Sequence, residues 1–276
     1  MHQSLADEAG TYESPPSPRE PARTLVVRCL GQFGMLSPDG WQSGPPLKKG
    51  RELLAYLVTH QRTVAAKDKL IEAFWPSSDG SEGTHRVHLA VSGARTALKT
   101  VLPGFDAIRS VGGGYAWNPA LHVASDVEEF LACANAATLS SCLTGVELYR
   151  GDFLAGNRGD WIEPIRIRCS SNYLEMLLRL ADDELARGEH RRAVEYGLRI
   201  MESDPGHEAG ARTLMRAFAA VGRRSAALIH YDGLRAYLQR HIGVQPSEET
   251  TRLWHDIRVG LEPSRAGGAA RQGSAR

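Results

Sequence analysis

A stretch of helical length, from Thr84 to Leu102, constrains the fold of this chain more than any other part. At the spacing of an α-helix, its apolar residues share one side: Val87, Ala90, Val91, Ala94, Leu98 and Leu102. The opposite side carries no acidic residue and consists of His85, His88, Ser92, Arg95 and Lys99. A strand pattern follows, interrupted by Gly112-Gly113-Gly114. A helix and a glycine hairpin in this order are what a winged helix needs to enter a DNA groove, although an ordinary surface helix can be equally two-sided.

The composition is that of a globular protein with room for two domains. Of the 276 residues, 42% are hydrophobic and 24% are charged. No run of eighteen apolar residues occurs, and the first residues lack the apolar core of a secretory signal, so we expect a cytoplasmic protein. The two ends, 1–23 and 262–276, are built mostly from small and polar residues, and we expect them to be disordered tails.

Charge is distributed unevenly along the chain. Residues 24–120 contain 11 Lys and Arg against 7 Asp and Glu, whereas residues 121–261 contain 17 against 20. A mildly basic module joined to a mildly acidic one fits a protein whose first part (24–120, the head) binds a polyanion and whose second part (121–261, the body) binds a different partner. Four cysteines show neither CxxC spacing nor an accompanying His cluster: Cys29, Cys133, Cys142 and Cys169. We therefore expect no metal site and no cofactor.

The pattern of residues 24–120 predicts a small sheet, three helices and a hairpin. The predicted elements are a strand at Leu25–Leu30, a turn at Pro38-Asp39-Gly40, helices over Leu47–His60 and Ala65–Phe74, a loop over Ser77–Gly83, the Thr84–Leu102 helix, and hairpin strands at Phe105–Ser110 and Tyr115–Asn118. Pro45-Pro46 opens the first helix. This is the element order of a winged helix-turn-helix.

In such a fold the last helix lies in the major groove, and its neighbours contact phosphates. Arginine can read guanine through two hydrogen bonds, and Ser or His can reach a base edge or a phosphate. We expect groove contacts from His85, Arg86, His88, Ser92 and Arg95. Cations in the first turn of a helix oppose its dipole, so basic residues there are explained by phosphates or, alternatively, by simple solvation. The expected phosphate contacts are Lys48, Lys49, Arg51, Lys99 and Arg109, and Gly113 and Tyr115 complete the DNA-binding set at the wing.

From Ser125 onward the pattern is helical, and it repeats. Ser125-x-x-Glu128 is a capping box that predicts a helix to about Ala137. Four pairs of residues are each separated by 34 positions: Leu180 and Leu214, Ala186 and Ala220, Gly188 and Gly222, Ala193 and Ala227. A period of 34 residues is that of tetratricopeptide repeats, which stack helix pairs into a curved protein-binding surface.

Both halves resemble known families. The leading strands, the helix from Arg86 to Leu98 and Gly113-Gly114-Tyr115 resemble an OmpR-type winged helix, although Ala94 stands where Leu is usual and the wing has one extra glycine. These departures bear on the base contacts rather than on the fold. The second half is similar to the bacterial transcriptional activator domain in the stretches Tyr149–Leu154, Asp160–Glu163, Arg166–Arg168, Tyr173-Leu174, Leu214–Arg216, Gly222–Leu228, Tyr231 and Gly243–Ser247. Most of these residues are expected to be structural, with Phe153 and Trp161 anchoring a join between helices.

A winged helix followed by this domain is the layout of the Streptomyces antibiotic regulatory protein (SARP) family. The resemblance implies a mainly α fold with a small β component, divided into a tail (1–23), an OmpR-type winged-helix DNA-binding domain (24–120), an activator domain of tetratricopeptide-like helices (121–261) and a second tail (262–276). It also implies an activator of antibiotic biosynthetic genes in the bacterial nucleoid. Its expected partners are double-stranded DNA at promoter direct repeats, bound as a head-to-tail dimer, and RNA polymerase, with no membrane contact.

Other functions fit parts of the sequence. The helical body could act alone as a protein-interaction adaptor, and the same head could repress a promoter by blocking it. An enzyme is disfavoured because no HExxH, GxSxG or GxxxxGK[ST] motif occurs.

Overall fold

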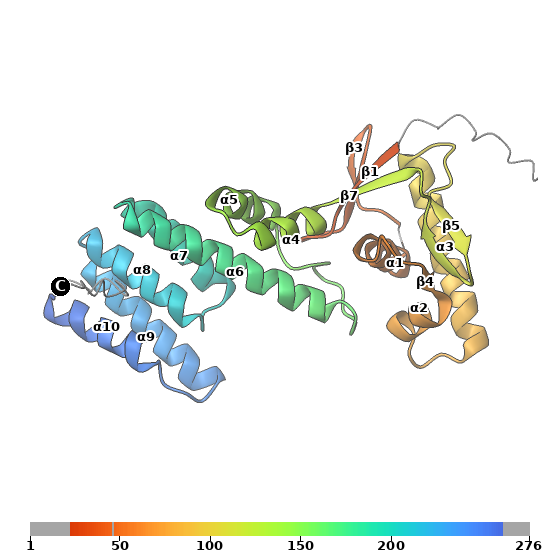
Figure 1. Cartoon of the computed structure of the whole chain (residues 1–276). Helices are drawn as coiled ribbons and strands as arrows, with labels where there is room; N and C mark the ends of the chain where they lie inside the picture. Colours follow the sequence, from red (N-terminus) through yellow and green to blue (C-terminus); the bar gives the residue numbers. More distant parts are fainter. Residues whose placement is uncertain (1–22, 46, 262–276) are drawn as a thin grey trace, which may run out of the picture.

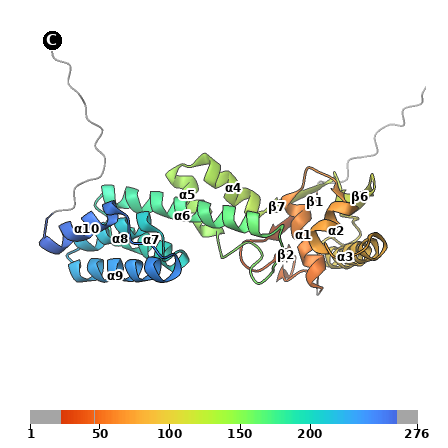
Figure 2. The same ribbon diagram turned by 90° about the horizontal axis from the view of Figure 1, so that it is seen from below.

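The computed structural model describes residues 23–45 and 47–261. The expected tails and Pro46 lie outside these residues, except that Arg23, expected in the first tail, begins the first strand. In the described part the strands and the helices between them gather at one end of an elongated molecule, and the helices that follow the last strand extend to the other (Figure 1, Figure 2). The fold is mainly α with a small β component, as the sequence predicts. None of the helices in the described ranges is long and apolar enough to cross a membrane.

The N-terminal half is a winged helix-turn-helix. Its elements are β1 (Arg23–Arg28), β2 (Gly34–Ser37), β3 (Gly40–Gln42), α1 (Lys48–Thr59), β4 (Ala65–Ala66), α2 (Lys67–Phe74), α3 (Gly80–Val101), β5 (Ile108–Val111), β6 (Gly114–Trp117) and β7 (Leu121–Ser125). One sheet has the order β3-β2-β1-β7, with β1 and β7 parallel, and the other has the order β4-β6-β5. The three predicted helices and the hairpin are all present.

Helix α3 begins earlier than the sequence predicts. The sequence predicts a loop over Ser77–Gly83, but in the structure the loop ends at Asp79 and the helix begins at Gly80. The Asp79 carboxylate accepts a hydrogen bond from the Glu82 backbone N–H at 2.7 Å and caps the helix. Gly83 lies in the first turn against α2, where an added Cβ would come within 2.7 Å of Ile71. The extra turn therefore depends on a cap and on a close helix contact that hydrophobic periodicity does not report.

The C-terminal half consists of helices. They are α4 (Asp126–Ala136), α5 (Leu139–Leu148), α6 (Glu163–Ala186), α7 (His190–Ser203), α8 (Glu208–Ala220), α9 (Arg224–His241) and α10 (Glu248–Val259). Ser125 caps α4 by accepting a hydrogen bond from the Glu128 backbone N–H at 3.2 Å, as predicted.

The 34-residue period corresponds to two helix-turn-helix units, α6–α7 and α8–α9. Gly188 and Gly222 occupy equivalent places in their turns and have φ values of 81° and 75°, a region that favours glycine. The backbone N–H groups of Glu189 and Arg223 each donate to a carbonyl five residues earlier, in both cases at 2.8 Å. The sequence repeat is therefore a repeat of the turn that ends one helix and starts the next.

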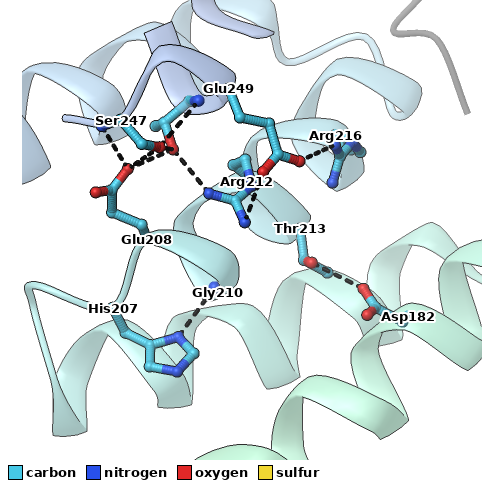
Figure 3. A network of polar contacts seen from close by, with 10 residues as sticks. Asp182, His207, Glu208, Gly210, Arg212, Thr213, Arg216, Ser247 and Glu249 are labelled. Atoms are coloured by element: carbon cyan, nitrogen blue, oxygen red, sulfur yellow. Dashed lines mark hydrogen bonds and ion pairs between the residues drawn. The ribbon is translucent and has the colours of Figure 1, made fainter. Parts of the chain in front are cut away.

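A polar network fixes α10 on α8 (Figure 3). Glu208 Oε2 accepts hydrogen bonds from the backbone N–H of Ser247 at 2.9 Å and from the Thr250 hydroxyl at 2.6 Å. Arg212 donates to the Thr250 hydroxyl at 2.9 Å and lies 3.2 Å from a Glu249 carboxylate oxygen. The last helix thus depends on side-chain contacts as well as on its small apolar interface with α8 and α9.

The two halves share one core. A continuous cluster of buried apolar residues extends from Leu25 in β1 to Ile200 in α7. The Asp126 carboxylate, at the start of α4, accepts hydrogen bonds from the backbone N–H groups of Cys29 and Leu30 at 2.7 and 3.0 Å. Burial raises the pKa of Asp126 to about 6 against the effect of these bonds. The join therefore contains a desolvated carboxyl held by the backbone that follows β1.

The Tyr149–Leu154 stretch lies against the end of β1. Phe153 forms a bridge to Leu30, and Trp161 packs edge-on to Tyr56 and Phe74, with ring centroids 5.3 and 5.7 Å apart. The sequence predicts that Phe153 and Trp161 anchor a join between helices. In the structure they pack between the head and the body. The expected boundary after residue 120 also falls before β7, a strand that is hydrogen-bonded within the first sheet.

Candidate nucleic-acid interface

The solvent-facing side of α3 is the centre of the candidate interface. From His85 to Lys99 its exposed residues share one side of the helix and are His85, His88, Leu89, Ser92, Thr96 and Lys99. The residues between them, such as Val87, Ala94 and Leu98, are buried in the core. The helix therefore presents a narrow, uncharged-to-basic stripe, which is the shape and charge that a major groove admits.

A groove lies along the second half of this stripe. It has a volume of about 820 Å³ and is bounded by α3 on one side and by the Pro103–Ala107 segment on the other. Three predicted contact residues, His88, Ser92 and Lys99, line it together with Arg95. Tyr115 lines it as well, so the structure brings five of the predicted residues to one concave surface.

The wing projects beside this groove. Strands β5 and β6 are antiparallel, and the turn between them is formed by Gly112 and Gly113, with φ values of 52° and 80°. Gly114 is required for a different reason, because an added Cβ would collide with the Ala65 carbonyl of β4. Arg109 is exposed on β5 and forms no ion pair with any residue that the structure describes.

Arg95 connects α3 to the wing. Its guanidinium donates to the Ile108 carbonyl oxygen, at 2.7 Å from Nη2 and 3.2 Å from Nε, and lies 3.9 Å from Asp106. The sequence predicts that Arg95 reads a base. In this structure its guanidinium holds the wing strand against the helix, while the side chain is 36% exposed and lines the groove. Arg95 therefore positions the wing, and base reading by Arg95 stays a prediction.

The two lysines at the start of α1 have an internal partner. Lys49 Nζ lies 2.8 Å from Glu52, and Lys48 Nζ lies 3.9 Å from it, while the Glu52 side chain is only 1% exposed. Asn157 of the body donates to the same carboxylate at 3.1 Å. Glu52 lies on the same helix and needs neutralising charge because it is buried. The two lysines therefore have a structural partner, and their phosphate contacts stay a prediction.

Three other predicted residues are placed as follows. Arg86 is half-buried and forms an ion pair with Glu82, one turn earlier on α3. Arg51 is half-buried on α1. The Tyr115 side chain lines the groove but is only 4% exposed, so it packs in the core and offers little surface for a direct contact. Burial raises the pKa of Tyr115, against the opposing effect of Arg95.

Two exposed α3 residues were missed from the sequence. Leu89 is 54% exposed, and Thr96 lies one turn beyond Ser92 on the same side. Their spacing from His85 and Ser92 was a sufficient signal. Leu89 was overlooked because an apolar residue in a helix is ordinarily assigned to the core.

Comparison with known proteins agrees with this architecture. Residues 122–258 match the family described as the bacterial transcriptional activator domain. The chain is 29% identical over 231 residues to the regulatory protein AfsR of Streptomyces coelicolor, which covers 78% of this chain but only 23% of AfsR. It is 23% identical over 267 residues to the transcriptional regulatory protein MoaR1 of Mycobacterium tuberculosis, covering 89% of this chain and 85% of MoaR1.

The fold also matches a solved structure, Mycobacterium tuberculosis EmbR in complex with a low-affinity phosphopeptide. The TM-score is 0.67 at 22% sequence identity, over 86% of this chain and 65% of that one. At this identity the match shows a shared fold. The domain match and the similarity to two regulatory proteins support the assignment of this chain to the SARP family of transcriptional regulators.

Proposed function

We propose that the protein binds promoter DNA sequence-specifically through α3 and the wing and activates transcription from it. The observation that carries this proposal is the exposed stripe on α3, which no other described element covers and which no acidic residue interrupts from His85 to Lys99. In the proposed complex His85, His88, Leu89, Ser92 and Thr96 face the base edges. Lys99 and Arg109 lie on either side and contact phosphates.

The groove beside the wing supports this arrangement. Arg95 fixes β5 against α3, so the exposed Arg109 and the turn at Gly113 are held at a set position relative to the stripe. A duplex lying on α3 would then meet the wing without first having to order it. Arg51 and Arg86 remain proposed contacts at the edge of this surface, and Arg86 would exchange its ion pair with Glu82 for one with a phosphate.

The finer features of the proposal follow from the family. We propose that the targets are direct repeats upstream of secondary-metabolite (antibiotic) biosynthetic genes, occupied by two molecules head to tail, and that the bound protein recruits RNA polymerase. The similarity to AfsR and MoaR1, both named as regulatory proteins, supports the coarser part of this picture. No catalytic step and no cofactor form part of it.

A titration of the full chain against the DNA upstream of its own gene tests the proposal. We expect a specific complex at moderate salt that survives competition by random DNA, and protection of two repeated segments in a footprint. No specific complex would favour the adaptor function. Transcription in vitro with purified RNA polymerase then separates activation from promoter blocking, because only an activator raises the transcript level above that of the polymerase alone.

A further inference from the structure

A cleft lies at the junction of head and body, away from the DNA-binding surface. It has a volume of about 610 Å³ and lies between the end of α1, on the head, and helices α4 and α6, on the body. Its apolar lining comes from Val58, Val127, Leu131 and Ile165. The volume falls in the range of small-molecule sites, and the lining combines an apolar part with polar side chains, as such sites usually do.

Two arginines give the cleft its charge. Arg62, on the loop after α1, and Arg168, on α6, both line it, and both are exposed. Among the residues that the structure describes, neither has a hydrogen-bond or ion-pair partner. Glu128 is the one acidic residue in the lining, and it already accepts a hydrogen bond from Gln61 at 3.1 Å.

The helix termini beside the cleft do not change the sign of the charge that the arginines give it. The C-terminus of α1 and the N-terminus of α4 both border the cleft, and their partial charges are opposite. The two guanidiniums, set against one engaged carboxylate, therefore leave the site positive. Guanidinium groups are well suited to carboxylate and phosphate oxygens, which they can bind through paired hydrogen bonds.

We propose that this cleft binds a small amphipathic anion. Its carboxylate or phosphate group lies between Arg62 and Arg168, and its apolar part lies on Leu131 and Ile165. Because one arginine belongs to the head and the other to the body, the ligand contacts both halves and stabilises their junction. The site is independent of the DNA-binding proposal, since none of its residues lies on α3 or on the wing.

Calorimetric titration of the full chain with octanoate, octyl phosphate and octanol tests the site. All three share one tail, so the difference among them isolates the charged group. We expect at least one of the two anions to bind and to raise the melting temperature, and octanol to bind at least about tenfold more weakly. The stronger of the two anions identifies the head-group chemistry.

Variants then locate the binding. Arg62→Gln and Arg168→Gln should each weaken the anion about tenfold, and together they should abolish its effect on the melting temperature. Ala132→Trp, at an exposed lining position, should block the cleft while leaving both charges in place. Arg235→Gln, which removes an exposed arginine on α9, is the matched control and should change nothing.

Three results would overturn the proposal: neither anion binds at millimolar concentration, octanol binds as well as the anions do, or the double variant binds the anion as tightly as the wild type.

Discussion

Single residues at the start of α1 show that one basic pattern can have two physical explanations. Lys48 and Lys49 oppose the helix dipole, and the sequence offers phosphate as the explanation. The structure offers Glu52, a buried carboxylate that Lys49 and Asn157 both contact. A buried charge that loses a partner is costly, so Lys49 has a structural role that would be present without any DNA.

This difference yields a paired prediction for Lys49 and Lys99. Lys49→Ala should lower the free energy of unfolding by about 1–3 kcal/mol, because it removes the nearest cation from Glu52. It should leave the salt dependence of DNA binding unchanged. Lys99→Ala should have the opposite pair of effects. It should reduce the slope of the logarithm of the DNA-binding constant against the logarithm of the salt concentration by about 1, and it should leave the free energy of unfolding unchanged. Urea unfolding and salt-dependent DNA titrations measure both, and equal salt slopes for the two variants would contradict the assignment.

Leu89 carries a second prediction at this scale. An exposed apolar side chain in the middle of the α3 stripe is suited to the methyl group of thymine. Once a target is known, replacing a contacted thymine by uracil should weaken wild-type binding by about 1 kcal/mol, the value of one buried methyl group. The Leu89→Ala variant should not distinguish the two DNAs. If the wild type binds the thymine and uracil forms of the site equally, whichever thymine is replaced, then Leu89 does not read the methyl group.

Sequence reasoning succeeded for single residues where the cause was local. The face of α3 follows from spacing alone, and His85, His88, Ser92 and Lys99 are all on it. The contact between Arg95 and the Ile108 carbonyl could not be predicted, because the two groups meet only after the wing has folded back. The burial of Tyr115 could not be predicted for a related reason, since it depends on α3 and β4 lying over the same strand.

At the scale of elements, we expect the attachment of α10 to be sensitive to pH. Burial raises the pKa of Glu208, but hydrogen bonds from Ser247 and Thr250 outweigh burial, and the net pKa lies below its usual 4.5. A carboxyl with a lowered pKa stabilises the fold above its unfolded-state pKa, and this contribution is lost as the pH falls through the folded-state value.

Glu208→Gln should therefore cost stability at neutral pH and little at acid pH. We expect a loss of about 1 kcal/mol at pH 7, a value reduced by solvent screening, because the variant keeps the shape of the side chain but weakens its hydrogen bonds. The difference from wild type should shrink below pH 4.5. Thermal melts followed by circular dichroism between pH 3 and 7 measure it, and a difference that does not change with pH would show that the charge of Glu208 is unimportant.

Elements were predictable where the signal repeats or has a fixed cap. The α6–α7 and α8–α9 turns were visible as a 34-residue period because each needs a glycine with positive φ at the same place. The start of α3 was predicted four residues late, since Ser77–Gly83 has the composition of a loop while Asp79 caps a helix within it.

At the scale of the whole molecule, head and body form one unit. Phe153, Trp161 and Asp126 contact residues of the head that lie about a hundred positions away in sequence, and a shared core continues through them. Local patterns carry no information about such distant pairs. For this reason the sequence predicted the two halves but not the join between them.

Calorimetry on Trp161 variants tests this unity. The wild type should unfold in a single transition, because one core extends through both halves. Trp161→Ala removes the contacts with Tyr56 and Phe74 and should lower the free energy of unfolding by about 2–3 kcal/mol and split or broaden the transition. Trp161→Phe, which keeps an aromatic ring, should recover most of the loss. Two transitions in the wild type would contradict a shared core.

The central claim, that the exposed side of α3 binds DNA, is tested most directly by placing one negative charge on it. Ser92→Asp changes an exposed residue at the middle of the stripe, and Ser171→Asp, on an exposed face of α6, is the matched control. Fluorescence anisotropy with the specific DNA site measures both affinities at one salt concentration. We predict that Ser92→Asp weakens binding at least tenfold, about 1.4 kcal/mol or more, and that Ser171→Asp has no effect. Equal affinities for the two folded variants would contradict the claim.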